Sequence, residues 1–300
     1  AIRRRECKLE RMRLGDQRQS TNVEDRRGRR VRGPIGLGGG GLGMILVVLV
    51  ISWLTGTNPL SLLQMTGGMP GEGTEVASGP PPADDAQSIF IKQVLGDLEE
   101  TWGQIFAQAG ERYPAPALVL FSDAVQSACG SASAATGPFY CPADSKVYLD
   151  LSFFRELDER FGAPGDFAQA YVVAHEVGHH VQNVLGVNAE VSRLQQRASQ
   201  VEANALSVKL ELQADCYAGV WGHHAARQDM LEPGDVDEGL RAAAAIGDDR
   251  LQRQTQGRVV PESFTHGTSA ERAQWLRQGL TSGRVEDCDT FGGRRANPQN

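Results

Sequence analysis

The amino-acid sequence predicts a helix-dominated α+β fold with a small antiparallel β element, preceded by one transmembrane helix. Three patterns predict it: an uncharged apolar stretch at residues 35–54, short runs of strand character between residues 117 and 151, and helical spacing over most of the chain after residue 153. A few strands followed by many helices are typical of α+β domains. With 300 residues, of which 40% are apolar, the chain is long enough for one large domain.

Changes in composition divide the chain into four regions. Residues 55–85 are rich in Gly, Pro, Ser and Thr, which is typical of a flexible stalk. The predicted regions are a basic cytoplasmic segment at 1–34, a transmembrane helix at 35–54, the stalk at 55–85 and a folded domain at 86–300.

The stretch from Ile35 to Leu54 contains no charged residue, and twenty residues at helical rise just span the core of a bilayer. Residues 1–34 carry twelve Lys and Arg against five Asp and Glu, so the positive-inside rule places them in the cytoplasm. The sequence thus predicts a single-pass cell-membrane protein with an extracytoplasmic domain, either periplasmic or at the cell surface. A cleaved signal peptide is disfavoured, since its basic region is normally short. A buried core helix is the other alternative.

The rest of the chain is acidic. It carries eighteen Lys and Arg against thirty-two Asp and Glu. Phosphate binding needs a basic face, so we expect no nucleic-acid partner.

The cysteines support an oxidising compartment. Cys7 stands alone before the apolar stretch, whereas Cys129, Cys141, Cys216 and Cys288 follow it, an even number that suits two disulfides. Four cysteines allow three pairings. Cys129–Cys141 would close a loop rich in Gly, Ser and Ala, and Cys216–Cys288 then follows by elimination. The alternative is four reduced, buried thiols.

Within the domain, the elements follow from periodicity and from capping and turn residues. The sequence predicts a strand at 117–121, a hairpin of strands at 139–140 and 146–151, and helices at 86–109, 166–185, 191–226, 235–245 and 269–279.

One predicted helix carries a metal-binding pattern. The stretch YVVAHEVGHHVQ, residues 171–182, contains His-Glu-x-x-His as His175, Glu176 and His179. Two histidines four residues apart project from one face of a helix, and imidazole nitrogen is a preferred ligand of Zn²⁺. Glu176 is rotated about a quarter-turn from His175, which places it beside the metal as a general base.

A third ligand is predicted on the next helix, in LELQADCYAGVW, residues 210–221. Glu211 and Asp215 lie four residues apart and share one face. We expect Glu211 to bind zinc and Asp215 to orient a ligand imidazole through its free N–H. An ordinary exposed acidic pair is disfavoured, because the surrounding residues are apolar.

The sequence resembles the bacterial family of putative neutral zinc metallopeptidases, which carry a single N-terminal membrane span. The His-Glu-x-x-His and Glu-x-x-x-Asp pair is also similar to the gluzincin pattern. The resemblance implies a zincin-like metallopeptidase domain, Zn²⁺ as cofactor, Glu176 as base and Glu211 as third ligand. It covers most of the chain and rests on NVEDRR, FYCPAD, VYLDLSFF, HEVGHHVQ, ELQADCYAGVW, AAAAIGDDRLQ and SFTHGTSAERAQW.

A further element, SFTHGTSAER, resembles one in membrane-associated gluzincins, in which Thr-His is followed six residues later by Arg. The matching residues are His266 and Arg272, which this resemblance places among the catalytic residues. A donor near the zinc would stabilise the oxyanion of a tetrahedral intermediate. The wider pattern often has Pro where this chain has Gly267. The alternative role of His266 is helix capping.

The sequence therefore predicts a membrane-anchored zinc metalloendopeptidase that acts on a peptide or protein substrate, with Glu176 as base and then proton donor. An extended substrate would align along an edge strand, for which residues 146–151 are the candidate. The alternative is a non-catalytic, zinc-stabilised, membrane-tethered scaffold or adaptor, which would coordinate the metal with four protein ligands.

Overall fold

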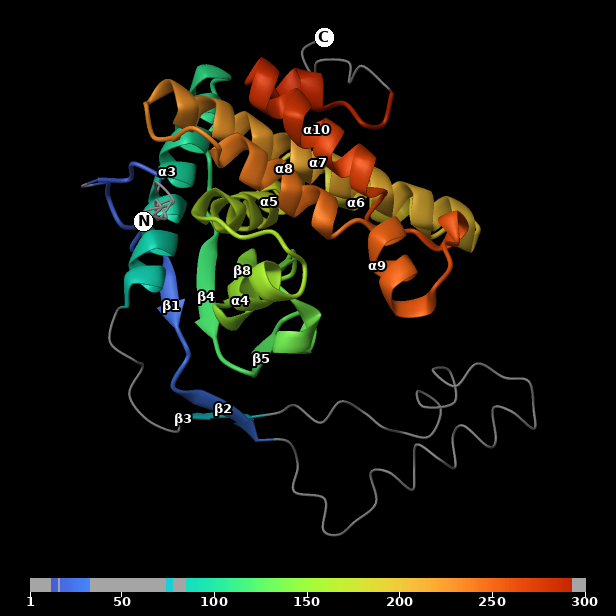
Figure 1. Ribbon diagram of the computed structural model, residues 1–300, viewed down its shortest axis with the longest axis horizontal. Helices are drawn as coiled ribbons and strands as arrows, with labels where there is room; N and C mark the ends of the chain where they lie inside the picture. The colour runs from blue at the N-terminus through green and yellow to red at the C-terminus, as the bar shows by residue number, and fades with distance from the viewer. Residues whose placement is uncertain (1–11, 16, 33–73, 78–84, 293–300) are drawn as a thin grey trace, which may run out of the picture.

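A mixed four-stranded sheet lies beside a layer of helices (Figure 1). The structure is a computed structural model that describes residues 12–15, 17–32, 74–77 and 85–292. The strands run in the order β1-β4-β8-β7. Their bounds are Val23–Asp25 for β1, Ala117–Phe121 for β4, Lys146–Asp150 for β8 and Phe139–Cys141 for β7.

The predicted antiparallel hairpin is present as β7 and β8, but the larger part of the sheet is parallel. β4 pairs in parallel with β8 on one side and with β1 on the other. Parallel pairing needs a crossover connection, and helix α3, Ala86–Gln108, lies in the chain between β1 and β4. β1 was not predicted from the sequence, because it is only three residues long and contains two acidic residues.

Two antiparallel pairs stand apart from this sheet. β5, Ala124–Ser127, and β6, Gly130–Ser133, form a hairpin. β2, Arg29–Arg32, pairs with β3, Thr74–Ala77, which lies within the segment predicted as a stalk.

Helices make up most of the remaining described chain, as predicted. They are α4, Ser152–Glu159; α5, Asp166–Val184; α6, Val187–Gln195; α7, Gln200–Arg227; α8, Asp235–Ala245; α9, Asp248–Gln256; and α10, Ser269–Ser282, with 3-10 turns η1, Ala134–Thr136; η2, Pro261–Ser263; and η3, Val285–Cys288.

The single helix predicted at 191–226 is wrong, because the chain breaks between α6 and α7. Ser199 caps α7: its side chain accepts a hydrogen bond from the Glu202 N–H, and the Glu202 carboxylate accepts one from the Ser199 N–H. This capping box starts a new helix at Gln200. Helical periodicity continues across the break, which is why the pattern concealed it.

Glycines let three helices approach closely around the core. A Cβ added at Gly178 of α5 would lie 2.9 Å from the Ala214 carbonyl oxygen of α7. One added at Gly279 of α10 would lie 2.0 Å from the Cys216 carbonyl oxygen. Only glycine allows backbones this close. α7 is therefore held between α5 and α10 at the level of the predicted site.

Both predicted disulfides are confirmed. Cys129 is bonded to Cys141, and Cys216 is bonded to Cys288. The second bond ties η3, near the end of the described chain, to the middle of α7.

The predicted separate basic segment at 1–34 differs from the structure over its described residues. Met12 and Leu14 are buried in the main core, and β1 belongs to the main sheet. The physical reason is that residues of this segment contact α3, β4 and α5. These contacts cannot be predicted from the charge pattern of the segment.

The predicted transmembrane helix at 35–54 lies outside the described residues. Among the residues that are described, no helix is both long enough and apolar enough to cross a bilayer. The single-pass anchor stays a prediction.

Candidate metal centre

Helix α5 presents two imidazoles to a common point. His175 and His179 lie on one face of α5, with ring centroids 4.7 Å apart. Both are largely buried, with side-chain exposures of 7% and 17%. The i, i+4 spacing predicted this pairing.

Helix α7 brings the third group. One oxygen of Glu211 lies 3.3 Å from His175 Nε2, and the other lies 3.4 Å from His179 Nε2. Ligand atoms of all three residues lie within 4.8 Å of one another. The close approach at Gly178 makes this possible, since Ala214 lies one helical turn beyond Glu211.

The donor set fits zinc. Zinc bonds of about 2.0–2.2 Å at tetrahedral angles place ligand atoms roughly 3.3–3.6 Å apart. The distances from Glu211 to the two imidazoles lie in this range. Two imidazoles and one carboxylate are also a ligand set of catalytic zinc sites, which leave a position for water.

The electrostatics of the site favour a cation. Burial disfavours charge on His175, but the nearby Asp215 and Glu211 carboxylates outweigh it and raise the pKa of His175 to about 10. Burial likewise opposes charge on Glu211, yet the imidazoles of His179 and His175 hold the pKa of Glu211 well below its usual range.

His175 is oriented from behind by a buried network. Its Nδ1 lies 2.8 Å from Asp215 Oδ1, and the Tyr171 hydroxyl donates a 2.6 Å hydrogen bond to the same oxygen. Arg272 donates to both Asp215 oxygens, at 2.8 and 2.9 Å. The carboxylate fixes the tautomer that leaves Nε2 free for a metal. The sequence predicted Asp215 in this role but missed Tyr171.

The structure corrects the predicted role of Arg272. Its side chain is 2% exposed and lies behind His175, against Asp215 and Tyr171. It has no access to a substrate in this position. Arg272 is therefore a positioning residue rather than a catalytic one.

His179 also has an orienting partner, which was not predicted from the sequence. His179 Nδ1 lies 2.9 Å from Gln182 Oε1. The Gln182 amide is itself fixed, because its Nε2 donates to the Leu210 carbonyl oxygen at 2.7 Å and to Gln213 Oε1 at 3.2 Å. The i, i+3 spacing of His179 and Gln182 was the available signal.

We predict that Gln182→Met lowers zinc affinity about 10–100-fold, because the His179 ring loses the group that sets its tautomer. Competition with a fluorescent zinc chelator measures the affinity. Gln104→Met, at an exposed position of α3, is the matched control and should bind zinc as the wild type does. Unchanged affinity in Gln182→Met would contradict the assigned role.

Glu176 follows His175 on α5, rotated about a quarter-turn around the helix axis. It is 8% exposed, and its carboxylate has no hydrogen-bond or ion-pair partner among the described residues. It is close enough to His179 to affect the charge of that imidazole. An unpaired carboxylate beside the ligands is the arrangement that a general base requires.

His266 is held near the centre by an acidic residue. Asp248, the first residue of α9, accepts hydrogen bonds from the backbone N–H groups of Thr265, His266 and Gly267 and lies 3.2 Å from His266 Nδ1. The Asp248 hydrogen bond raises the pKa of His266, and the Glu211 charge acts in the same direction. The His266 side chain is 51% exposed, so it is open to a substrate.

Gly267 stands where the wider gluzincin pattern often has proline, and its backbone conformation explains this difference. Its φ is +90°, in the region that favours glycine and that proline cannot adopt. An added Cβ would lie 3.3 Å from Leu212 Cδ2, next to Glu211 in the chain. The loop therefore packs directly on α7.

Comparisons with known proteins agree with this geometry. Residues 12–291 match the model of a family described as putative neutral zinc metallopeptidase. The chain belongs to this family. It is 48% identical over 288 residues to "Uncharacterized protein YpfJ" of Escherichia coli (strain K12), covering 94% of this chain and 99% of that protein. It is 49% identical over 190 residues to "Uncharacterized protein Rv2575" of Mycobacterium tuberculosis (strain ATCC 25618 / H37Rv), covering 60% and 63%. No solved structure matches.

Family membership confirms the resemblance found in the sequence. The family match begins at residue 12, so it includes the segment that carries β1. His180, the next residue after His179 on α5, makes a structural contact: its ring lies 3.0 Å from the Tyr140 hydroxyl and 2.6 Å from the Pro114 carbonyl oxygen.

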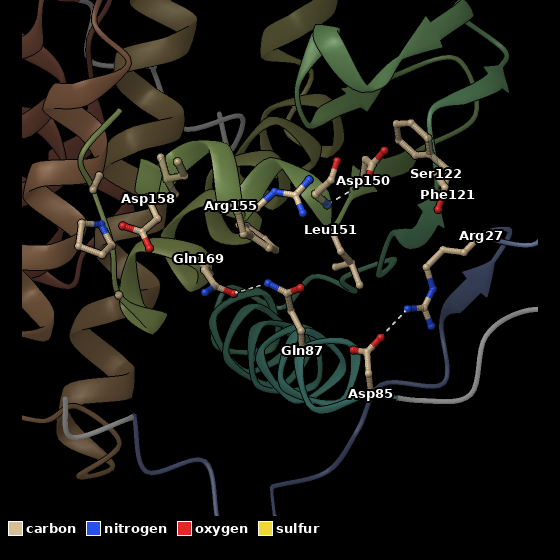
Figure 2. A pocket seen from close by; sticks show the side chains of 16 residues that line it. Arg27, Asp85, Gln87, Phe121, Ser122, Asp150, Leu151, Arg155, Asp158 and Gln169 are labelled. Carbon is tan, nitrogen blue, oxygen red and sulfur yellow. Dashed lines mark hydrogen bonds and ion pairs between the residues drawn. The ribbon is translucent and has the colours of Figure 1, made fainter. Parts of the chain in front are cut away.

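A cavity of about 500 Å³ lies elsewhere, where β4 and β8 end (Figure 2). Its lining includes Arg27, Asp85, Phe121, Asp150 and Gln169, but none of the three candidate ligands. It is therefore separate from the candidate metal centre.

A second carboxylate cluster lies at the start of α5. Oxygens of Asp166, Asp235 and Glu238 lie within 4.8 Å of one another. Burial, together with the neighbouring Asp166 and Asp235, raises the pKa of Glu238 to about 7. Burial also raises the pKa of Asp235 to about 6.

The raised pKa of Glu238 predicts that the free energy of unfolding falls as the pH rises. Between the usual value of 4.5 and about 7, folded Glu238 holds a proton that the unfolded chain has lost, so folding is favoured at the lower pH. Glu238→Gln should flatten the dependence of the melting temperature on pH in this window. The exposed Glu111→Gln should leave the profile unchanged. Parallel profiles for wild type and Glu238→Gln would contradict the prediction.

Proposed function

We propose that this protein is a zinc-dependent metalloendopeptidase that hydrolyses peptide bonds, with Glu176 as general base. The observation that carries the proposal is the convergence of His175, His179 and Glu211, in which both imidazoles are fixed through Nδ1 by Asp215 and Gln182. Three protein ligands are typical of catalytic zinc sites.

Each residue of the site has a separate role in the proposed hydrolysis. Zinc, when bound, supplies a Lewis acid that polarises water and the scissile carbonyl. Glu176 takes the proton from the attacking water and delivers it to the leaving amine. His266, on the exposed loop held by Asp248, donates a hydrogen bond to the oxyanion.

The substrate strand proposed from the sequence needs correction. Residues 146–150 form β8, which pairs with β4 and β7 and so has no open edge. In the described sheet the edges are β1 and β7. β7 lies near the ligands, because the Tyr140 hydroxyl contacts His180 and Asn183 of α5. We assign an extended peptide substrate to the β7 edge.

The compartment forms part of the proposal. Two disulfides favour an oxidising environment, so we place the domain outside the cytoplasm, in a periplasm or at the cell surface. The apolar residues 35–54 would associate the protein with the cell membrane.

A non-catalytic scaffold is the alternative. It would use a fourth protein ligand, and among the described residues only three groups meet at this point. A structural site also has no use for the unpaired Glu176 carboxylate.

The test is zinc analysis of the full-length protein together with digestion of a peptide library. We expect one zinc per chain and cleavage that stops with a chelator and returns with zinc. Tightly bound zinc without cleavage of any peptide would support the scaffold instead.

We also predict that Asp248→Ala lowers kcat about 10²-fold with KM and zinc content unchanged, because the oxyanion donor His266 loses its anchor. Steady-state kinetics on a cleaved peptide measure this. Asp237→Ala, at an exposed position of α8, is the control. A change in KM alone would show that Asp248 serves substrate binding instead.

A further inference from the structure

The segment before residues 35–54 is built into the same domain as the chain that follows them. β1 pairs in parallel with β4, matching Val23–Asp25 with Leu118–Leu120. The ladder is extended at both ends: the Leu118 N–H donates to the Asn22 carbonyl oxygen at 2.8 Å, and the Arg26 N–H donates to the Leu120 carbonyl oxygen at 2.7 Å. β1 lies directly beside β4 in Figure 1.

Burial shows that this is a packed contact and not a surface one. Met12, Leu14 and Ser20 are only 5–6% exposed. Helix α3 is adapted to the segment, because a Cβ added at Gly96 would lie 2.2 Å from the Arg18 carbonyl oxygen. The segment therefore crosses α3 at a point where a side chain would block it.

Two of the arginines before the apolar stretch, Arg26 and Arg27, make ion pairs within the domain. Arg27 pairs with Asp25 at 2.6 Å. It also pairs with Asp85 at 2.9 Å (Figure 2). Arg26 pairs with Glu24, which also binds Lys146 of β8. These charges have a structural use, so they are weak evidence for a cytoplasmic location.

The two ends of the intervening chain also meet. β2 and β3 are antiparallel, and Arg32 is paired with Thr74. Paired Cα atoms in such a ladder lie about 4.5–5.5 Å apart. The chain therefore leaves the described structure at residue 32 and returns to it at residue 74 beside the point where it left.

We propose that residues 12–32 and residues 85–292 lie in the same compartment, on one side of any membrane. A single crossing would place β1 and β4 on opposite sides of the bilayer and prevent their pairing. Both disulfides lie in the same folded unit, which puts the amino-terminal segment in the oxidising compartment with them. This replaces the cytoplasmic location predicted for residues 1–34, and it is independent of the proposed catalytic activity.

Cysteine labelling of the full-length protein in cells tests the proposal. Cys7 is the one cysteine outside the two disulfides, so Cys7→Ser gives a background without a free thiol. Thr21→Cys and Val201→Cys then place single thiols at exposed positions, one in the segment before β1 and one in α7. Each is treated with a membrane-impermeant maleimide, in intact cells and after detergent solubilisation.

We expect the two thiols to react to the same extent, relative to solubilised protein, in intact cells. Native Cys7 in the wild type should follow them. A cytoplasmic thiol protein, which must stay unlabelled in intact cells, controls for lysis. Labelling of Val201→Cys with protection of Thr21→Cys, or the reverse, would overturn the proposal.

Discussion

Glu176→Gln should retain zinc and lose about 10²–10⁴-fold in kcat. The amide has nearly the shape of the carboxylate but cannot accept the proton of the attacking water, and general base catalysis contributes about this factor. The carboxylate makes no contact that supports the fold in the described structure, so stability should change little. Metal content by mass spectrometry and steady-state rates on a cleaved peptide measure the two quantities.

The control is Glu159→Gln, at an exposed position of α4. It should match the wild type in rate and zinc content. Glu211→Gln provides the opposite comparison, because it replaces a candidate ligand and should lose metal. Full hydrolysis by zinc-loaded Glu176→Gln would exclude Glu176 as the base.

The candidate ligands and the disulfides could be predicted, because the ligand motifs are local in sequence and the cysteines are few. His175 and His179 share a helical face by spacing alone, and four cysteines leave few pairings. The prediction of Glu211 required a second motif, but that motif also lies in a strongly helical segment. Short-range periodicity was sufficient for these elements.

The parts that were missed depend on contacts distant in sequence. β1 is three residues long, and its parallel partner lies some ninety residues further on. In the sequence, Asp248 has the pattern of an ordinary helix start. Its hydrogen bond with the His266 loop forms only in the folded chain. The role of Arg272 was misassigned because the sequence pattern gives its proximity to the metal but not the side from which it approaches.

Arg272→Met should destabilise the protein by about 3–5 kcal/mol and weaken zinc binding as well. Arg272 and Asp215 are 2% and 0% exposed, so removal of the guanidinium takes a bidentate counter-charge from a buried carboxylate and leaves it with His175 and the Tyr171 hydroxyl. Asp215 also orients His175, so we expect zinc affinity to fall about 10–100-fold. Urea unfolding of the chelator-treated protein and zinc competition measure the two effects separately.

The double variant Arg272→Met/Asp215→Asn distinguishes positioning from general support of the fold. Removing both charges should restore much of the stability, because no unpaired carboxylate remains buried. Zinc affinity should stay low, since an amide is a poorer acceptor for the His175 N–H than a carboxylate. Arg277→Met, exposed on the same helix, should change neither quantity. If zinc affinity recovered together with stability, Arg272 and Asp215 would act on the metal only through the fold.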